Sequence, residues 1–202
     1  MSLFPLFVDL AGKRVVVVGG GKVGRRKAAA AVLAGGLVRV VDPALAPSAE
    51  VVSEPYSARH IADAQLVFAC ATPDVNARVV SDATLCGIWV NAASDPDAGD
   101  ILLPAVVKRG DLTIAVSTGG ASPALARRIR EKLKVEFDES FAAWVALLAE
   151  MRPLVLEAIP DPERRRALLD GFADWPWLDR VRAEGVDAVR EAMKKHIADG
   201  AV

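Results

Sequence analysis

Three glycines with the spacing Gly19-x-Gly21-x-x-Gly24 follow a run of four valines, and this spacing suits the binding of a pyrophosphate. Where a strand turns into a helix, the first glycine permits the tight bend, the second lets the backbone approach a pyrophosphate, and the third lets helix and strand pack closely. The beginning of the helix also presents free N–H groups to phosphates. The pattern predicts a dinucleotide site; an ordinary strand–helix turn is the alternative interpretation.

Asp42 ends the next apolar run, where the dinucleotide fingerprint has an acidic residue about 20 residues after the glycines. A carboxylate at this position accepts hydrogen bonds from the hydroxyls of the adenosine ribose and repels a 2′-phosphate. We therefore predict NAD rather than NADP as the cofactor. A helix cap or a solvated turn residue is the alternative interpretation of Asp42.

Basic residues crowd the first turns of the helix that follows the glycines. They are Lys22, Arg25, Arg26 and Lys27. The helix dipole disfavours cations at this end, so their presence predicts a bound anion nearby. A solvated charged face that tolerates the small cost is the alternative interpretation.

A second turn with glycines and small hydroxyl residues precedes another expected helix. It contains Ser117, Thr118, Gly119, Gly120, Ala121, Ser122 and Pro123. Backbone N–H groups of such a turn can bind a carboxylate or a phosphate, and arginines at positions 127, 128 and 130 add positive charge. An ordinary loop is the alternative interpretation, because serine is a good N-cap and proline suits the first helical position.

The reaction type is indicated by what accompanies the dinucleotide pattern. The segment from Gly19 lacks the Gly-Lys-Ser/Thr ending of a P-loop, and no Ser/His/Asp set is apparent in a chain with two histidines. A dinucleotide site without an obvious acid–base pair favours hydride transfer, in which the cofactor does the chemistry and the protein orients the substrate.

The elements that must hold these residues alternate between strands and helices. Strands are expected at residues 15–18, 37–41, 51–52, 66–70 and 88–91, and helices at residues 22–34 and 74–85. Valine-rich runs without polar alternation are typical of parallel strands buried on both faces. The alternation predicts an α/β fold with a Rossmann-type, doubly wound parallel sheet.

The pattern changes after residue 91. Strands at residues 101–103 and 112–117 around a turn at 108–111 predict a hairpin, a helix follows from Ser122, and the rest of the chain is helical in pattern. We predict a dinucleotide-binding domain over residues 1–112, a small α+β region over 113–145 and a helical C-terminal domain over 146–202.

The bulk composition argues against several classes of protein. The 202 residues are 52% apolar with a net charge of −1, which gives no sign of a nucleic-acid or membrane partner. No apolar run reaches the roughly 18 residues of a spanning helix, and no signal peptide is recognisable. Cys70 and Cys86 are expected to be buried thiols, and no metal-ligand spacing is apparent. We expect a cytoplasmic protein without a metal site.

These segments together resemble the siroheme synthase family, which comprises precorrin-2 dehydrogenases, some of which are also sirohydrochlorin ferrochelatases. The resemblance spans residues 3–135, and the C-terminal third is similar only in helical character and length. It is carried by Phe4-Pro5-Leu6-Phe7, by residues 18–27, by Ala71-Thr72-Pro73-Asp74-Val75-Asn76, by Val90-Asn91, by Leu103-Pro104-Ala105 and by residues 109–130.

The resemblance implies a homodimer in which residues 113–145 form the dimerisation region. It implies NAD-dependent oxidation of precorrin-2, a tetrapyrrole with eight carboxylate arms, to sirohydrochlorin. By family position, backbone groups of Lys22 and Val23 contact the cofactor, Pro43 and Ala44 lie near its adenosine, and Thr72 and Asn91 line its nicotinamide side. The basic clusters suggest residues that receive substrate carboxylates: Arg26, Ser117, Gly119, Gly120 and Arg127.

One departure from the family pattern concerns the reacting groups. Family members commonly have Asn-x-x-Asp, whereas here Asn91 is followed three residues later by Ser94, with Asp95 one position further. A shift of one residue on an extended segment turns a side chain to the other face. We therefore name Ser94, Asp95 and the hydroxyl of Thr118 as candidate catalytic groups, with Asp97 and Asp100 as further options.

The departure at Ser94 also bears on the choice between activities. The leading hypothesis is a precorrin-2 dehydrogenase without a second activity. A bifunctional enzyme that also inserts Fe²⁺ is the second, and the missing aspartate argues against it. A non-catalytic NAD-binding regulatory module is the third, motivated by the same absence.

Overall fold

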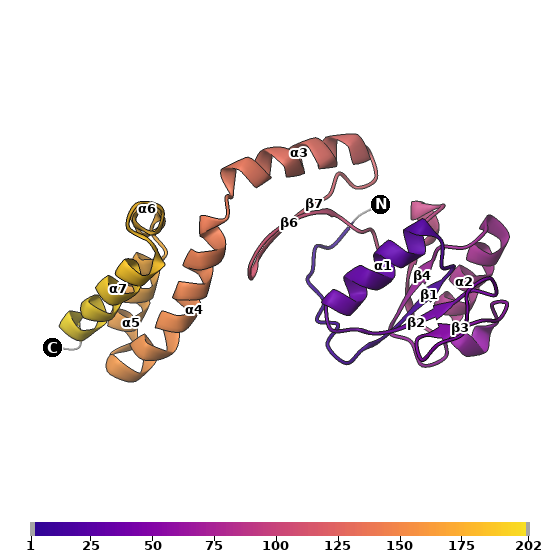
Figure 1. Ribbon diagram of the computed structural model, residues 1–202, viewed down its shortest axis with the longest axis horizontal. Coiled ribbons are helices and arrows are strands. Elements are labelled where there is room, and N and C mark those ends of the chain that lie inside the picture. Colours follow the sequence, from indigo (N-terminus) through magenta and orange to yellow (C-terminus); the bar gives the residue numbers. More distant parts are fainter. Residues whose placement is uncertain (1–2, 201–202) are drawn as a thin grey trace. The chain divides into compact units, whose positions relative to one another are not determined.

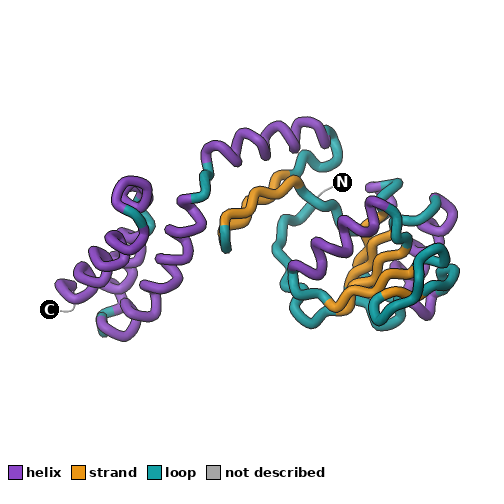
Figure 2. The backbone as a smooth tube through the Cα atoms, in the orientation of Figure 1, coloured by secondary structure: helices purple, strands orange, loops and turns teal. Residues whose placement is uncertain are grey.

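The computed structural model describes residues 3–200 and divides them into two compact units (Figures 1 and 2). The first unit runs to Leu103 and also holds Gly119–Ala121, and the second holds Pro104–Thr118 and the chain from Ser122 onward. The change of unit at Leu103 comes earlier than residue 112. The division into three domains stays a prediction.

The first unit contains a five-stranded parallel sheet in the order β3-β2-β1-β4-β5. Its strands are β1 (Arg14–Val18), β2 (Leu37–Val41), β3 (Val51–Val52), β4 (Leu66–Ala69) and β5 (Trp89–Ala92). The strand order reverses between β1 and β4, and in such sheets ligands bind outside the carboxyl ends of the strands at this point. The predicted Rossmann-type sheet is confirmed.

Helices pack on both faces of this sheet because its central strand is apolar on both sides. Val15 and Val17 share one core with Ala31 of α1 (Lys22–Leu33). Val16 and Val18 share the other core with residues of α2 (Pro73–Leu85). Successive strand residues point to opposite faces, so the four-valine run serves both cores. Figure 1 shows α1 and α2 beside the labelled strands.

The two cysteines do not match the expectation of buried thiols. Cys70, just after β4, is half-buried, whereas Cys86 is exposed. Cys86 is the C-cap residue of α2, one turn beyond the last position of that helix that faces the core, Ala83. The expectation was therefore wrong for Cys86.

The predicted hairpin exists, but its first strand lies later than expected. Residues 101–103 are not a strand, and the hairpin consists of β6 (Ala105–Arg109) and β7 (Leu112–Val116). The backbone of Ile101 is engaged elsewhere: its N–H donates to Val90 O at 3.2 Å and its carbonyl accepts from the Asn91 side chain at 2.6 Å. The turn is shorter than predicted because Gly110, with φ of 56°, supplies the bend.

The rest of the second unit is helical. It contains α3 (Pro123–Glu136), α4 (Ser140–Ala158), α5 (Pro162–Phe172), α6 (Trp175–Glu184) and α7 (Val186–Gly200). The Ser122 hydroxyl accepts a hydrogen bond from Leu125 N–H at 3.2 Å, which confirms the predicted N-cap of α3. The core forms around α4, where Trp144, Leu147 and Met151 are buried. Between residues 3 and 200, no helix has both the length and the apolar character needed to cross a bilayer.

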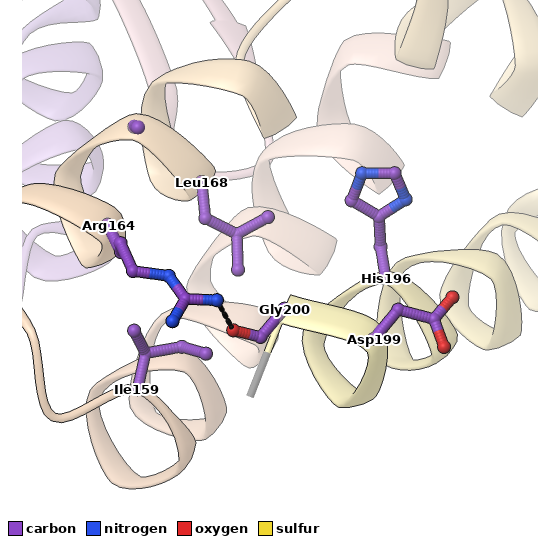
Figure 3. A pocket seen from close by; sticks show the side chains of 7 residues that line it. Ile159, Arg164, Leu168, His196, Asp199 and Gly200 are labelled. Carbon is purple, nitrogen blue, oxygen red and sulfur yellow. Dashed lines mark hydrogen bonds between the residues drawn. The ribbon is translucent and has the colours of Figure 1, made fainter. Parts of the chain in front are cut away.

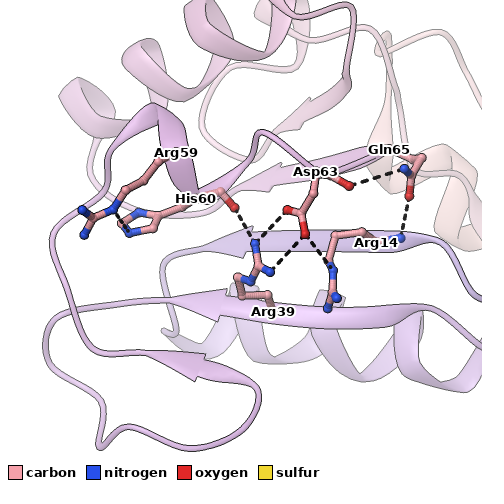
Figure 4. A network of polar contacts seen from close by, with 6 residues as sticks. All are labelled: Arg14, Arg39, Arg59, His60, Asp63 and Gln65. Carbon is pink, nitrogen blue, oxygen red and sulfur yellow. Dashed lines mark hydrogen bonds and ion pairs between the residues drawn. The ribbon is translucent and has the colours of Figure 1, made fainter.

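A polar network ties three strands of the first unit together (Figure 4). Asp63 precedes β4, and its carboxylate accepts from both Arg39 Nη atoms of β2, at 2.8 and 3.1 Å. Arg14 Nε of β1 lies 3.4 Å from the same carboxylate. The Gln65 side chain accepts from Arg14 N–H at 2.6 Å. The hydrogen bonds from Arg39 hold the pKa of the Asp63 carboxyl below its usual range.

Replacing Asp63 with asparagine is expected to lower the free energy of unfolding by about 0.5–1 kcal/mol at neutral pH, the usual size for exposed ion pairs. Because the pKa of Asp63 is lower in the folded chain, its stabilisation is present above the unfolded pKa of about 4 and is lost as the pH falls through the folded pKa. Urea unfolding across this range measures the effect. If the difference in unfolding free energy between wild type and Asp63→Asn does not become smaller below about pH 4, the ionised Asp63 does not stabilise the fold as proposed.

Candidate functional site

The three glycines after β1 are required for three different reasons. Gly19 has φ of 101°, and a Cβ there would lie 2.5 Å from Cys70 O. A Cβ on Gly24 would lie 1.9 Å from Gly19 O. Gly21 has an ordinary φ of −66°, and a Cβ there would meet no protein atom within 4 Å. Packing therefore explains Gly19 and Gly24, while Gly21 borders open space.

The beginning of α1 is not capped by a side chain. Gly21 is its N-cap residue and makes no side-chain hydrogen bond, and the first intrahelical bond runs from Arg25 N–H to Gly21 O at 2.9 Å. The amides of Lys22, Val23 and Gly24 have no acceptor within the helix. An open glycine beside such amides suits a pyrophosphate, so these residues fit a dinucleotide.

Asp42 holds the glycine turn in place. Its Oδ2 accepts from Gly20 N–H at 2.6 Å, and its Oδ1 accepts from Ala44 N–H at 2.8 Å. The carboxylate thereby joins the glycine turn to the bend at Pro43 and Ala44. Sequence reasoning did not identify these two bonds. Each carboxylate oxygen has a further lone pair, so Asp42 can still accept a hydrogen bond from a ribose hydroxyl, and that contact stays a prediction.

Lys27 differs from the other basic residues of α1. Lys22, Arg25 and Arg26 are exposed, whereas Lys27 is 8% exposed. It lies one turn after Gly24 on the buried face of the helix, and its Nζ donates to Asn91 Oδ1. Burial lowers the pKa of Lys27. The interpretation of four cations around one bound anion is therefore wrong for Lys27, because its helical position faces the sheet.

Asn91 of β5 is engaged at both ends of its amide. Its Oδ1 accepts from Lys27, and its Nδ2 donates to Ile101 O at 2.6 Å. The side chain is buried, with 5% exposed. Asn91 thus connects α1 to the segment that follows β5. Its place beside the nicotinamide stays a prediction.

Asn76 of α2 organises the turn after β4 and the loop after β5. Its Oδ1 accepts from Ala71 N–H at 2.8 Å, and its Nδ2 donates to Ala71 O at 3.2 Å and to Ser94 Oγ at 3.0 Å. A backbone N–H can only donate, so the amide orientation is fixed and Ser94 Oγ is an acceptor. The Ser94 proton therefore points away from Asn76. Thr72, the N-cap residue of α2, makes no side-chain cap bond.

The acidic residues after β5 have local roles. Asp95 Oδ1 accepts from Asp97 N–H at 3.1 Å and caps the short 3₁₀ helix Pro96–Ala98. Asp100 Oδ2 accepts from Val90 N–H at 3.2 Å. The Ser94 hydroxyl is held by the buried side chain of Asn76, and the Asp95 side chain is exposed. Both residues stay candidate catalytic groups.

The second predicted turn has the backbone shape that its glycines suggest. Gly119 and Gly120 have φ of 61° and 89°, and Thr118 Oγ1 accepts from Ser122 N–H at 3.0 Å. Thr118 thus supports the turn that leads into α3. The roles predicted for Ser117, Thr118, Gly119, Gly120 and Arg127 stay predictions.

Two family models cover most of the sheet-containing unit and the hairpin region. An NAD(P)-binding model matches residues 6–105, and a model described as sirohaem biosynthesis protein central matches residues 109–135. The chain is 37% identical to a siroheme synthase of Pseudomonas putida and 33% identical to one of Chromobacterium violaceum. These alignments cover 100% and 99% of this chain. The chain belongs to the siroheme synthase family.

The chain matches part of the curated relatives but the whole of a solved structure. The chain spans about half the length of the curated siroheme synthases it matches, since 45% of each is covered. A solved structure titled "SirC, precorrin-2 dehydrogenase" matches over 100% of its own length and 96% of this chain, with a TM-score of 0.73 and 27% identity. The fold is therefore that of this family, and the NAD(P)-binding model over residues 6–105 supports a nicotinamide cofactor.

The helical unit contains a cavity that sequence reasoning missed (Figure 3). Its volume is about 470 Å³, and its lining includes Ile159, Arg164, Leu168, His196 and Asp199. Arg164 Nη2 donates across it to Gly200 O at 2.6 Å. The His196 ring packs edge-on against Phe172 and Trp177, so its role there is packing. No sequence motif marked this cavity.

Proposed function

We propose that this chain catalyses the NAD-dependent oxidation of precorrin-2 to sirohydrochlorin. The observation that carries the proposal is the uncapped beginning of α1 beside Gly21, where an added side chain would enter open space. The whole-length similarity to the structure titled as a precorrin-2 dehydrogenase supports the choice of substrate.

The chain supplies positions for the cofactor at three points of the first unit. Amides of Lys22 and Val23 bind the pyrophosphate, and Asp42, with Pro43 and Ala44 beside it, binds the adenosine ribose. When bound, NAD⁺ accepts the hydride. The nicotinamide faces the region of Thr72 and Asn91, at the carboxyl ends of β4 and β5.

Each unit, taken by itself, also supplies groups that suit a carboxylate of the substrate. Arg26 is exposed on α1, and Arg127 is exposed on α3 close to the glycine turn. Cations and backbone N–H groups bind carboxylates with charge-assisted hydrogen bonds. The Ser94 hydroxyl, whose oxygen accepts from Asn76, directs its proton outward and serves as a hydrogen-bond donor to substrate or cofactor. The proton released by oxidation passes to water or to Asp95.

We also propose that the chain acts as a homodimer through the region at 113–145. Apolar side chains remain exposed on the hairpin and on α3. Within this region they are Leu125, Ile129 and Val135 of α3, with exposed fractions of 49, 36 and 82%, and Val106 of the neighbouring strand β6 is 42% exposed. Sedimentation equilibrium of the purified chain tests this state, and a monomer at micromolar concentration contradicts it.

The activity is tested by mixing the purified chain, NAD⁺ and precorrin-2 without oxygen. Sirohydrochlorin absorbance and NADH fluorescence should rise together in a one-to-one ratio. A parallel sample with sirohydrochlorin and Fe²⁺ measures metal insertion, which is expected at the uncatalysed rate. Binding of NAD⁺ without any turnover supports a regulatory module instead, and failure to bind NAD⁺ removes the proposal.

Replacing Asp42 with alanine is expected to lower NAD affinity about tenfold more than NADP affinity. Both cofactors lose the support that Asp42 gives to Gly20 and Ala44, but only NAD loses the ribose acceptor, and the repulsion of a 2′-phosphate disappears. Calorimetric titration of both cofactors measures the ratio. Asp42→Asn removes the charge but keeps only one of the two acceptors, so NADP should lose less affinity than NAD. Equal losses in Asp42→Ala show that Asp42 does not select the cofactor.

A further inference from the structure

Lys27 is a buried cation that has no acidic partner in the part of the chain that the structure describes. Its side chain is 8% exposed, and among residues 3–200 it takes part in no ion pair within 4.0 Å. Its Nζ bonds to Asn91 Oδ1 and lies 5.3 Å from the centre of the Phe68 ring. Buried charges are usually paired with opposite charges. The uncompensated charge of Lys27 therefore calls for a functional explanation.

The surroundings of Lys27 hold the ammonium in one place without neutralising it. The Asn91 amide cannot rotate, because its Nδ2 donates to Ile101 O and its oxygen must then face Lys27. The Phe68 ring attracts a cation through its π face. Cys70 is the nearby group that could become negative, but burial raises the pKa of its thiol and keeps it neutral.

The Lys27 ammonium lies beside β4 and β5, on the side of the sheet where the nicotinamide half of a dinucleotide is expected. Asn91 in β5 is paired with Phe68 in β4, one residue before both strands end. Asp42 marks the other side, at the end of β2, where the fingerprint places the adenosine ribose. A dinucleotide that crosses the sheet between them brings its nicotinamide to the β4–β5 side.

We propose that the Lys27 ammonium makes the bound cofactor a stronger hydride acceptor by favouring the reduced nicotinamide over the oxidised one. The oxidised ring carries a positive charge, which it loses when the hydride arrives from the substrate carbon. A fixed cation nearby repels the oxidised ring and not the neutral reduced ring. Lys27 acts through its charge. This inference rests on the proposed function.

The test compares the affinities of the two redox forms of the cofactor. Dissociation constants for NAD⁺ and NADH are measured by calorimetry for the wild type and for Lys27→Met, which keeps the length of the side chain and removes its charge. The ratio Kd(NAD⁺)/Kd(NADH) is expected to fall about tenfold. Two unit charges about 12 Å apart give an effect of this size at an effective dielectric constant of about 20.

A matched control uses an exposed cation of the same helix. Lys22→Met also removes one charge from α1, but Lys22 is solvent-exposed at the helix start. It should weaken both forms of the cofactor by the same factor, because both carry the same pyrophosphate. An unchanged ratio in Lys22→Met and a lowered ratio in Lys27→Met support the inference.

A second variant covers the case in which Lys27→Met does not fold. Lys27→Gln removes the charge but keeps an N–H donor for Asn91 Oδ1, and it should lower the same ratio. If the folded variants keep the wild-type ratio, Lys27 does not bias the redox state, although the proposed function stands. If the wild type binds neither form of the cofactor, the proposed function fails instead.

Discussion

Replacing Gly21 with valine is expected to lower the affinity for NAD(H) by at least about 100-fold while the chain keeps its fold. Gly21 has a backbone conformation that any residue adopts, and a Cβ there meets no protein atom within 4 Å. The valine side chain instead occupies the space in front of the amides of Lys22 and Val23. Losing two hydrogen bonds to a charged pyrophosphate costs about 3 kcal/mol or more, which is about a factor of 100.

Calorimetric titration of NADH into Gly21→Val measures the loss, and circular dichroism with thermal unfolding checks the fold. The melting temperature should stay within about 2 °C of the wild type, since no core contact changes. A smaller replacement, Gly21→Ala, fills less of the same space and should give an intermediate loss. If Gly21→Val binds NADH as the wild type does, the dinucleotide does not lie at this turn.

Local rules were sufficient to predict the strand–turn–helix formed by β1, the glycine turn and α1. The run Val15–Val18 consists of β-branched residues without polar alternation, which favours a strand buried on both faces, and the glycines that follow it end that strand. The cap of α3 was equally local, because Ser122 and Pro123 act within one helical turn. Predictions of this kind depend on neighbours in the sequence, which is why they were confirmed.

Bonds between distant segments could not be predicted in the same way. Lys27 and Asn91 are 64 residues apart, and only the packed sheet brings the ammonium to the amide. The Asn76–Ser94 bond joins the first turn of α2 to the loop after β5, which meet because β4 and β5 are neighbours. The sequence marked Asn91 and Ser94 through the family pattern, yet Asn76 appeared only as one letter of a motif. Its role depends on the direction of its amide, which the fold determines.

The hairpin shows a different limit. Residues 101–103 have the apolar character of a strand, and no local feature opposes that prediction. They are not a strand because Val90 and Asn91 bind the backbone of Ile101, so that no second strand can pair with it there. An apolar run predicts that a segment is buried more reliably than it predicts that the segment pairs with a neighbouring strand.

Replacing Gly24 with alanine is expected to lower the free energy of unfolding of the first unit by about 3 kcal/mol or more. An added Cβ would lie 1.9 Å from Gly19 O and 3.2 Å from Val17 Cγ1. The first of these atoms belongs to the backbone, so α1 must move away from β1 and the core between them must open. Inserting one carbon into a well-packed core typically costs about 1–3 kcal/mol, and a contact this short with a carbonyl lies at or beyond the upper end.

Gly21→Ala is the matched control, because it adds the same methyl group three residues earlier on the same turn, where no protein atom lies within 4 Å. Hydrogen–deuterium exchange of peptides from β1 and α1 reports the stability of the first unit separately from that of the helical unit. Exchange should accelerate by about 100-fold in Gly24→Ala and stay near wild type in Gly21→Ala, since 1.4 kcal/mol corresponds to a factor of ten. Cofactor binding should fall in both variants, but for different reasons: the helix is displaced in one and the phosphate space is filled in the other. If Gly24→Ala exchanges like the wild type, α1 does not pack on β1 as closely as this geometry requires.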